Sequence, residues 1–192
     1  MNKEEKLQIT KNKLIDATIT LMEQAEDPMK VTSREIARAA DCKPSMINYC
    51  FGSREDLIYQ VFQTQYQNYL MGSQVEEIMK QNLTPKELLK ELHFIVAKCL
   101  VENYTFTKAI TGFVLFKRDL SKESFSFPYV MQHYGGKKSA EECKVIAYEL
   151  STMMQLIVYR KDEIKRDIGI DLENDAELRK LINLRIDLLL GA

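Results

Sequence analysis

Apolar residues recur every three or four positions along most of the chain, which is the spacing of amphipathic helices. This pattern predicts a short helix near residues 129–134 and longer helices over residues 4–25, 54–70, 85–100, 103–116, 139–158 and 175–190. The charged stretch 161–174, which contains Gly169, is predicted to be a loop. No stretch alternates apolar and polar residues with a period of two. The sequence therefore predicts an all-α fold.

Three of the predicted helices begin with a capping sequence. Thr32 with Glu35 and Ser139 with Glu142 have the spacing of capping boxes, in which each side chain bonds to the other residue's backbone N–H. Thr84 precedes a proline at the first helical position, where the missing N–H costs nothing. These starts fix where the helices begin more firmly than the periodicity alone does.

Residues 31–57 contain two short helical stripes separated by a turn at Asp41. The first helix is predicted to begin near Ser33, and the second begins at Pro44 and is anchored by Ile47. Two helices joined by a turn of about three to four residues form a helix-turn-helix, whose second helix can enter the major groove of DNA.

This segment resembles the DNA-binding unit of the TetR family of bacterial transcriptional regulators, whose pattern is roughly T-x-x-x-I-A-x-x-A-G-V-S-x-G-x-L-Y-x-H-F-x-S-K-E-x-L. The identical or similar residues here are Thr32, Ile36, Ala37, Ala40, Ile47, Phe51, Ser53, Arg54, Glu55 and Leu57, and Tyr49 follows the position where tyrosine is common. Upstream, residues 14–25 are similar to the family's first helix. The resemblance covers about the first 70 residues. Asp41 replaces the usual turn glycine, and aspartate adopts left-handed backbone more readily than most residues. Lys43, Asn48 and Cys50 stand where Ser, Tyr and His are common.

The resemblance implies a DNA-binding head in residues 1–53 and an effector-binding and dimerisation domain in residues 54–192. The positions where the family contacts DNA are occupied here by Ser33, Arg34, Lys43, Pro44, Ser45, Met46, Asn48, Tyr49 and Arg54. The hydroxyl groups and cations of this set can bind DNA phosphates. Arginine can in addition recognise guanine, and asparagine can recognise adenine.

The family also places an effector pocket in the larger domain. Aromatic side chains that would line it are Phe62, Tyr66, Phe94, Tyr104, Phe113 and Phe116. The alternative is that these rings, which have helical spacing, simply fill the core. The effector itself is an unidentified small molecule.

The last helix is apolar on most of its sides, so it is buried either in a core or against a partner chain. In the TetR family the last two helices of each subunit form a four-helix dimer interface. We therefore expect a homodimer, whose interface residues would be Ile146, Leu150, Met154, Ile157, Leu178, Leu181, Ile182 and Leu189.

The charge of the head is that of a near-neutral domain, not of a strongly basic DNA-binding domain. The net charge is −1, and residues 1–56 carry nine Lys or Arg against ten Asp or Glu. This balance is evidence against tight non-specific binding, because phosphate neutralisation supplies most of that affinity.

We expect a repressor that a small-molecule effector releases from its operator in double-stranded DNA. The competing interpretation is a helical ligand-binding or partner-binding protein that has lost useful DNA affinity.

Other classes of protein are less well supported. No apolar run approaches the roughly 18 residues of a membrane span, and the N-terminus lacks the apolar segment of a signal peptide, so a cytoplasmic protein is expected. The chain has no phosphate loop, hydrolase motif or metal-ligand spacing, so no catalytic residue, cofactor or metal is predicted. His93 and His133 are expected to be structural.

The four cysteines contain no C-x-x-C and are expected to be free thiols. Cys42 and Cys50 bracket the predicted recognition helix. Either simple packing near the turn or a role in sensing oxidation accounts for their positions.

Overall fold

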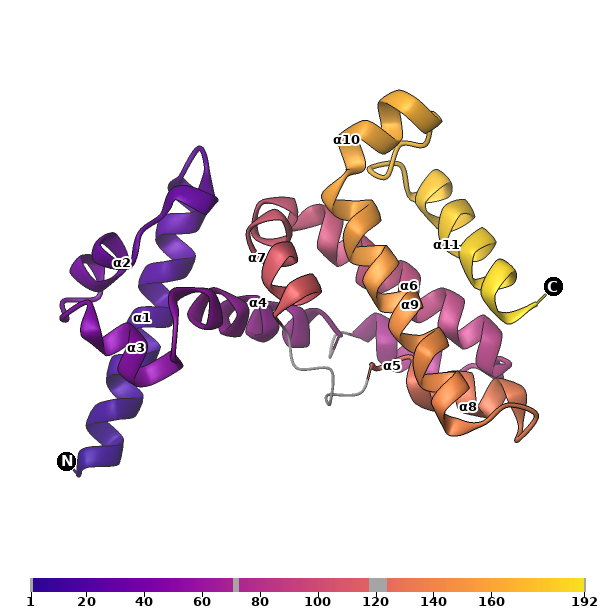
Figure 1. The fold of residues 1–192 in the computed structure, drawn as a ribbon, viewed down its shortest axis with the longest axis horizontal. Coiled ribbons are helices and arrows are strands. Elements are labelled where there is room, and N and C mark those ends of the chain that lie inside the picture. Colours follow the sequence, from indigo (N-terminus) through magenta and orange to yellow (C-terminus); the bar gives the residue numbers. More distant parts are fainter. Residues whose placement is uncertain (1, 71–72, 118–123, 192) are drawn as a thin grey trace. The chain divides into compact units, whose positions relative to one another are not determined.

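The computed structural model describes residues 2–70, 73–117 and 124–191, and the side chains of residue 29 and residues 65–74 lie outside that description. The described chain is helical and contains no strand, which confirms the predicted all-α class (Figure 1). It divides into two compact units. Unit 1 comprises residues 1–67 and 105–116, and unit 2 comprises residues 68–104 and 117–192.

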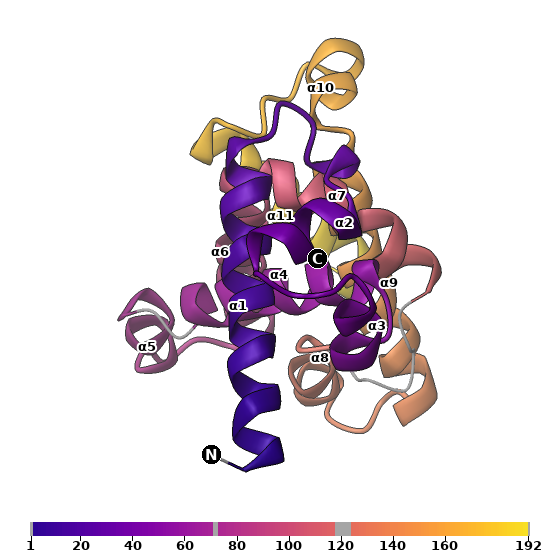
Figure 2. The same cartoon turned by 90° about the vertical axis from the view of Figure 1, so that its left-hand side faces the viewer.

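Unit 1 is built around a long first helix. Its elements are α1 (Lys3–Gln24), the 3-10 turn η1 (Pro28–Lys30), α2 (Ser33–Ala39), α3 (Ser45–Phe51), most of α4 (Arg54–Leu70) and α7 (Tyr104–Phe116). α1 packs against both α2 and α3 (Figure 2). Leu14, Thr18 and Met22 form the buried stripe of α1, and the same core takes Ile36 from α2 and Ile47 from α3. The apolar periodicity of the first helix therefore marks the face that holds the two short helices.

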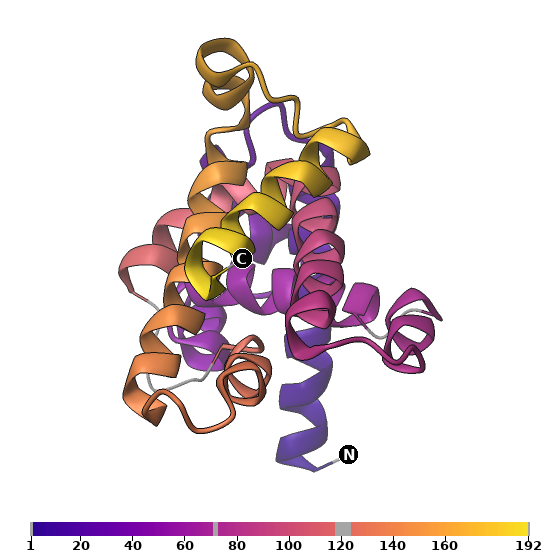
Figure 3. The ribbon, with the colours of Figure 1, turned by 90° about the vertical axis from the view of Figure 1, so that its right-hand side faces the viewer.

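Unit 2 is a helical bundle around α6. Its elements are α5 (Ser73–Met79), α6 (Pro85–Glu102), α8 (Phe127–Tyr134), α9 (Ala140–Tyr159), the single turn α10 (Lys161–Glu163), the π-helical turn η2 (Ile164–Ile168) and α11 (Asp175–Leu190). α6 packs against α8, α9 and α11, and α11 lies beside both α6 and α9 (Figure 3). Leu89, Leu92 and Leu100 of α6 are buried between these neighbours.

The predicted helix starts agree with the structure. Capping boxes open α2 at Thr32, α6 at Thr84 and α9 at Ser139, each with the glutamate three residues later bonded back to the cap. α8 begins at Phe127, two residues before the predicted start. α5 was not predicted, because seven residues are too few to show a clear period.

The prediction of a loop over residues 161–174 is wrong for its first half. Residues 161–168 continue as α10 and η2, and Gly169, with a φ of 79°, ends them. The charges that suggested a loop are paired on the folded turn, where Lys161 lies 2.5 Å from Glu173 and Lys165 lies 2.5 Å from Asp171. Charge alone did not distinguish a solvated loop from a short helix held by ion pairs.

The compact units do not follow the domain boundary expected after residue 53. α7 belongs to unit 1, and its Phe113 ring lies 5.3 Å from the ring of Tyr59 on α4. The expected boundary separates two functions, whereas the compact units are defined by packing. The boundary after residue 53 therefore stays a prediction. None of the described helices combines the length and apolar character that crossing a membrane requires.

Candidate nucleic-acid interface

The first helix of the predicted helix-turn-helix is α2, and its start is held by local hydrogen bonds. The backbone N–H of Thr32 donates to Glu35 Oε2 over 2.7 Å, and the N–H of Glu35 donates back to Thr32 Oγ1 over 3.3 Å. Donation from the Thr32 backbone and hydroxyl holds the pKa of the Glu35 carboxyl below its usual value. Ile36 and Ala37 are then completely buried, so α2 is fixed on its inner side.

The turn between α2 and α3 depends on Asp41. Its φ is 51°, and no other non-glycine residue in the described chain has a positive φ. The N–H of Cys42 donates to the carbonyl of Ala37 over 2.9 Å, and that of Asp41 to the carbonyl of Arg38 over 3.2 Å. These bonds satisfy carbonyls at the end of α2 and reverse the chain. The expectation that aspartate would adopt left-handed backbone here is confirmed.

α3, the predicted recognition helix, is held by a single buried anchor. Ile47 is fully buried, whereas the other side chains of α3 are exposed or half-buried. The residue before the helix is Pro44, and no side chain caps it; the N–H of Met46 instead bonds to the carbonyl of Lys43 over 2.9 Å. One inward residue on a helix of seven leaves most of its surface available to a partner.

Most of the predicted DNA-contacting residues are exposed on unit 1. Arg34, Lys43, Pro44, Ser45, Asn48 and Tyr49 are exposed, and Ser33 and Met46 are half-buried. Tyr49 shows 62% of its surface, which is unusual for so large a ring. An exposed ring with a hydroxyl group can both pack on a partner and bond to phosphate.

Arg54 is the exception among the predicted contacts. Its Nε donates to the carbonyl of Val31 over 2.6 Å, and its Nη1 lies 3.2 Å from Glu55 Oε1. Its side chain is only 19% exposed. The arginine therefore ties the start of α4 to the segment before α2, a structural role that the sequence did not indicate.

Gly52 and Ser53 form the junction between α3 and α4. Gly52 has a φ of 92°, in the region that favours glycine. The Ser53 hydroxyl lies 2.6 Å from Asp56 Oδ2, and the N–H of Asp56 donates to Ser53 Oγ over 3.0 Å. This reciprocal cap holds the start of α4 directly after α3.

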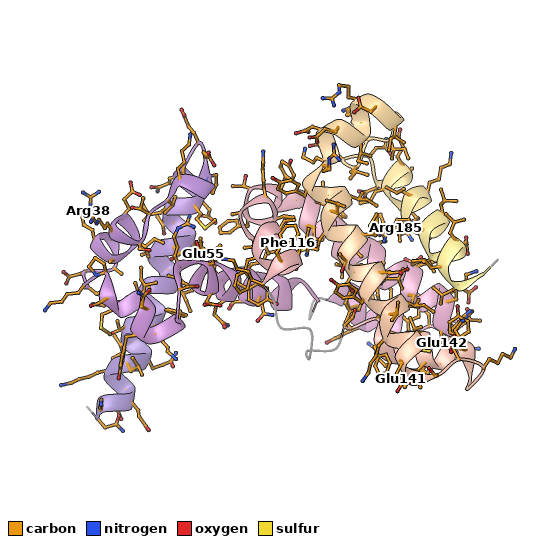
Figure 4. The ribbon with its side chains drawn as sticks, viewed as in Figure 1. Arg38, Glu55, Phe116, Glu141, Glu142 and Arg185 are labelled. Atoms are coloured by element: carbon orange, nitrogen blue, oxygen red, sulfur yellow. The ribbon has the colours of Figure 1, made fainter. Side chains whose placement is uncertain are left out.

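Arg38 is a candidate contact that sequence reasoning missed. It lies on α2 four residues after Arg34, so both arginines share one face of that helix. Its side chain is exposed and extends outward from the head (Figure 4). The spacing of four between two arginines was the available signal. With Lys43, these two give the head three exposed cations near the turn, whereas α3 itself carries no charged residue.

Cys42 and Cys50, which bracket the predicted recognition helix, are free and half-buried. Burial raises the pKa of the Cys42 thiol, as does the neighbouring Cys50, and burial also raises the pKa of Cys50. A raised pKa lowers the fraction of reactive thiolate at neutral pH. The packing explanation of these two positions is therefore favoured over oxidation sensing.

The predicted effector residues come from both units. Phe62 of α4 is buried, Phe116 at the end of α7 is 84% exposed, and the side chain of Tyr66 lies outside the described residues. In unit 2, Phe94 lies under the Arg179 guanidinium at 3.9 Å, and the Tyr104 hydroxyl donates to the carbonyl of Tyr159 over 3.1 Å. The pocket predicted from these rings stays a prediction.

The residues predicted for the dimer interface differ in their burial within unit 2. Leu150, Met154, Leu178 and Ile182 are buried in the core of unit 2, whereas Ile146, Ile157, Leu181 and Leu189 are half-buried. The exposed apolar side chains of the same two helices are Val145, Tyr148, Met153, Leu156 and Tyr159 on α9 and Leu184 and Leu188 on α11. The predicted interface stays a prediction, because helical spacing alone does not separate the buried stripe of each helix from its exposed stripe.

A comparison with models of known protein families gave no match, and a comparison with curated proteins gave none either.

Proposed function

We propose that this protein is a sequence-specific DNA-binding transcriptional regulator of the TetR type, with α3 as its recognition helix. The observation that carries the proposal is the way α3 is presented. Ile47 alone anchors the helix, Asp41 makes the turn before it, and Asn48 and Tyr49 are left exposed. An asparagine can pair with adenine through two hydrogen bonds, and a tyrosine hydroxyl can bond to phosphate.

The proposed regulator acts as a homodimer through α9 and α11. Each of these neighbouring helices exposes a stripe of large apolar residues, including Tyr148 and Leu156 on α9 and Leu188, which is 75% exposed, on α11. Pairing with a second copy would remove these side chains from water. Two-fold symmetry would also give the protein two recognition helices for half-sites about 34 Å apart, or a multiple of that distance.

The proposed regulation follows from a two-state dimer. An effector that binds better to the state with the wrong spacing of recognition helices lowers operator affinity, and operator DNA lowers effector affinity by the same factor. This mechanism makes the protein a repressor that its ligand releases.

A second candidate function is supported by the charge of the head. α3 has no charged side chain and no side-chain cap, and residues 1–56 carry nine basic against ten acidic residues. A helical ligand-binding or partner-binding protein without useful DNA affinity would have such a head. The two functions differ in whether the exposed face of α3 recognises bases.

Selection of bound duplexes from a random pool tests the choice. The wild-type protein is expected to enrich a palindromic sequence, because a two-fold dimer contacts two half-sites. Asn48→Ala is expected to relax the preference at one position of each half-site, by about 1–3 kcal/mol. Arg160→Ala, which removes an exposed cation from unit 2, is the matched control and should select the same sequence. Failure of the wild-type protein to enrich any sequence would favour the second function.

The dimer is tested separately by light scattering. Leu188→Glu places a charge on the exposed stripe of α11 and is expected to give monomers. Ile168→Glu changes a residue of similar exposure, 62%, in η2 and should leave the mass of the dimer unchanged. Equal behaviour of the two variants would exclude the proposed interface.

A further inference from the structure

Arg185 on α11 is a part-buried cation without a carboxylate partner among the described residues. Its Nη2 donates to the backbone carbonyl of Leu150 on α9 over 3.2 Å. Neighbouring cations of the bundle are paired: Arg179 lies 2.6 Å from Glu91, and Lys90 lies 2.8 Å from Asp187. Burial without an opposite charge lowers the pKa of Arg185 to about 10. Arg185 lies on α11 near the middle of the bundle, where α11 runs beside α9 (Figure 4).

The positive charge of Arg185 acts on a buried histidine of α6. His93 is fully buried, its Nε2 lies 2.7 Å from Ser126 Oγ, and its ring is 5.0 Å from that of Phe125. Its Nδ1 is buried and has no partner in the described residues. Burial, and to a lesser degree the positive charge of Arg185, lower the pKa of His93 to about 3, so the ring is neutral at pH 7.

Further polar groups come from α9 and from the segment before α8. Ser151 Oγ lies 2.6 Å from Ser124 Oγ. Ser124 Oγ also accepts a hydrogen bond from the N–H of Ser126, the residue whose hydroxyl bonds to His93. Gln155 lies one helical turn after Ser151, and its Oε1 is buried without a partner in the described chain. Unpartnered polar atoms are rare inside proteins, and each lowers stability unless another group satisfies it.

The chemistry of these groups selects one kind of ligand group. A guanidinium has five donors in a planar fork that matches a carboxylate through two parallel hydrogen bonds. With His93 neutral, Arg185 supplies the positive charge of this group of residues, which a monoanion neutralises and a phosphate dianion exceeds. If the Ser126 hydroxyl donates to Nε2, the Nδ1–H of His93 is available as a further donor.

We propose that Arg185 and His93 bind the carboxylate group of a small organic acid, which is the effector of the regulator. The site lies in unit 2 and is formed by α6, α9 and α11. This assignment rests on the proposed function for the role of the ligand, but the binding itself does not depend on DNA.

Carboxylates paired with their neutral amides test the binding. Acetate, hexanoate and benzoate, each compared with the corresponding amide and with inorganic phosphate at equal ionic strength, are titrated into the full-length protein in thermal unfolding and calorimetry. At least one carboxylate is expected to raise the unfolding temperature in a saturable way that its amide and phosphate do not reproduce. Absence of any such difference in all three pairs would overturn the proposal.

Variants on one helix identify the cation. Arg185→Gln is expected to weaken binding of the active carboxylate by about tenfold or more, because it removes hydrogen bonds to a charged group. Arg179→Gln is the matched control: it removes a cation from the same helix that already has Glu91 as a partner, and it should bind normally. An equal loss in both variants, or no loss in Arg185→Gln, would overturn the assignment.

A structural role for Arg185 has a different signature. Replacing an unpaired part-buried charge by an apolar side chain should raise the stability of ligand-free Arg185→Leu while abolishing its response to carboxylate. Lower stability of this variant would assign Arg185 to the fold, and a lower dimer mass would assign it to a carboxylate of a partner chain; both results contradict the proposal. DNA binding is measured on the same wild-type preparation. A carboxylate response without DNA binding would then contradict the proposed regulator and leave the ligand site supported.

Discussion

Gly52, between α3 and α4, provides a test in which the sign of the effect is predicted. Its φ is 92°, and a Cβ built there would lie 3.3 Å from Asp56 Oδ2, the atom that bonds Ser53. Placing alanine in such a backbone costs about 1–3 kcal/mol. Restricting the unfolded chain returns about 0.4–1 kcal/mol. Gly52→Ala is therefore expected to destabilise unit 1 by about 1–2 kcal/mol.

The same substitution elsewhere in unit 1 is expected to have the opposite sign. Gly112 lies inside α7, has no positive φ, and a Cβ there would meet nothing within 4 Å. Alanine favours a helix over glycine, so Gly112→Ala should stabilise by about 0.5–1 kcal/mol. Urea unfolding followed by circular dichroism measures both changes, and amide exchange assigns them to unit 1. Changes of the same sign in both variants would refute the geometry assigned to the α3–α4 junction.

Three further predictions follow from single side chains. Arg54→Lys should lower stability by about 1–2 kcal/mol in urea, because lysine has no equivalent of the Nε–H bonded to Val31. The pKa of His93 is about 3 in the folded protein and near 6.5 in the unfolded chain. Between these pH values the unfolded chain binds one more proton, so the free energy of unfolding should fall as the pH falls from 6.5. His93→Asn should reduce this pH dependence in urea titrations at several pH values. The raised pKa values of Cys42 and Cys50 predict slow reaction with iodoacetamide at pH 7, and rapid labelling of either in the folded protein would restore the oxidation-sensing alternative.

The sequence was most informative where a local signal has a local cause. Capping boxes such as Ser139 with Glu142 act over one turn of helix, and the left-handed turn at Asp41 depends on the conformational range of one residue. Such features can be predicted without the rest of the chain. The all-α class followed in the same way from helical spacing.

Features that depend on distant partners were not accessible. Leu150 and Leu156 both fit a helical stripe of α9, yet the first is buried and the second is exposed, because α6, α8 and α11 cover only one side of the helix. Nothing local in the sequence shows that the Nε of Arg54 donates to the carbonyl of Val31, 23 residues earlier. Nothing in the sequence distinguishes Arg185 from the other arginines. What distinguishes it is the absence of an acidic partner among the described residues, which only the packed bundle shows.

The salt dependence of DNA binding tests the central claim most directly. Arg34, Arg38 and Lys43 are the three exposed cations near the turn of each head, so a dimer that places these six on phosphates should show a slope of log K against log salt of about −5. Arg34→Ala should make this slope shallower by about two, because the dimer loses two contacts. Saturable binding to the selected duplex with these slopes, and weak binding to random duplex, is the predicted result. Equal affinity for both duplexes, or a slope that Arg34→Ala leaves unchanged, would contradict recognition of DNA by this head.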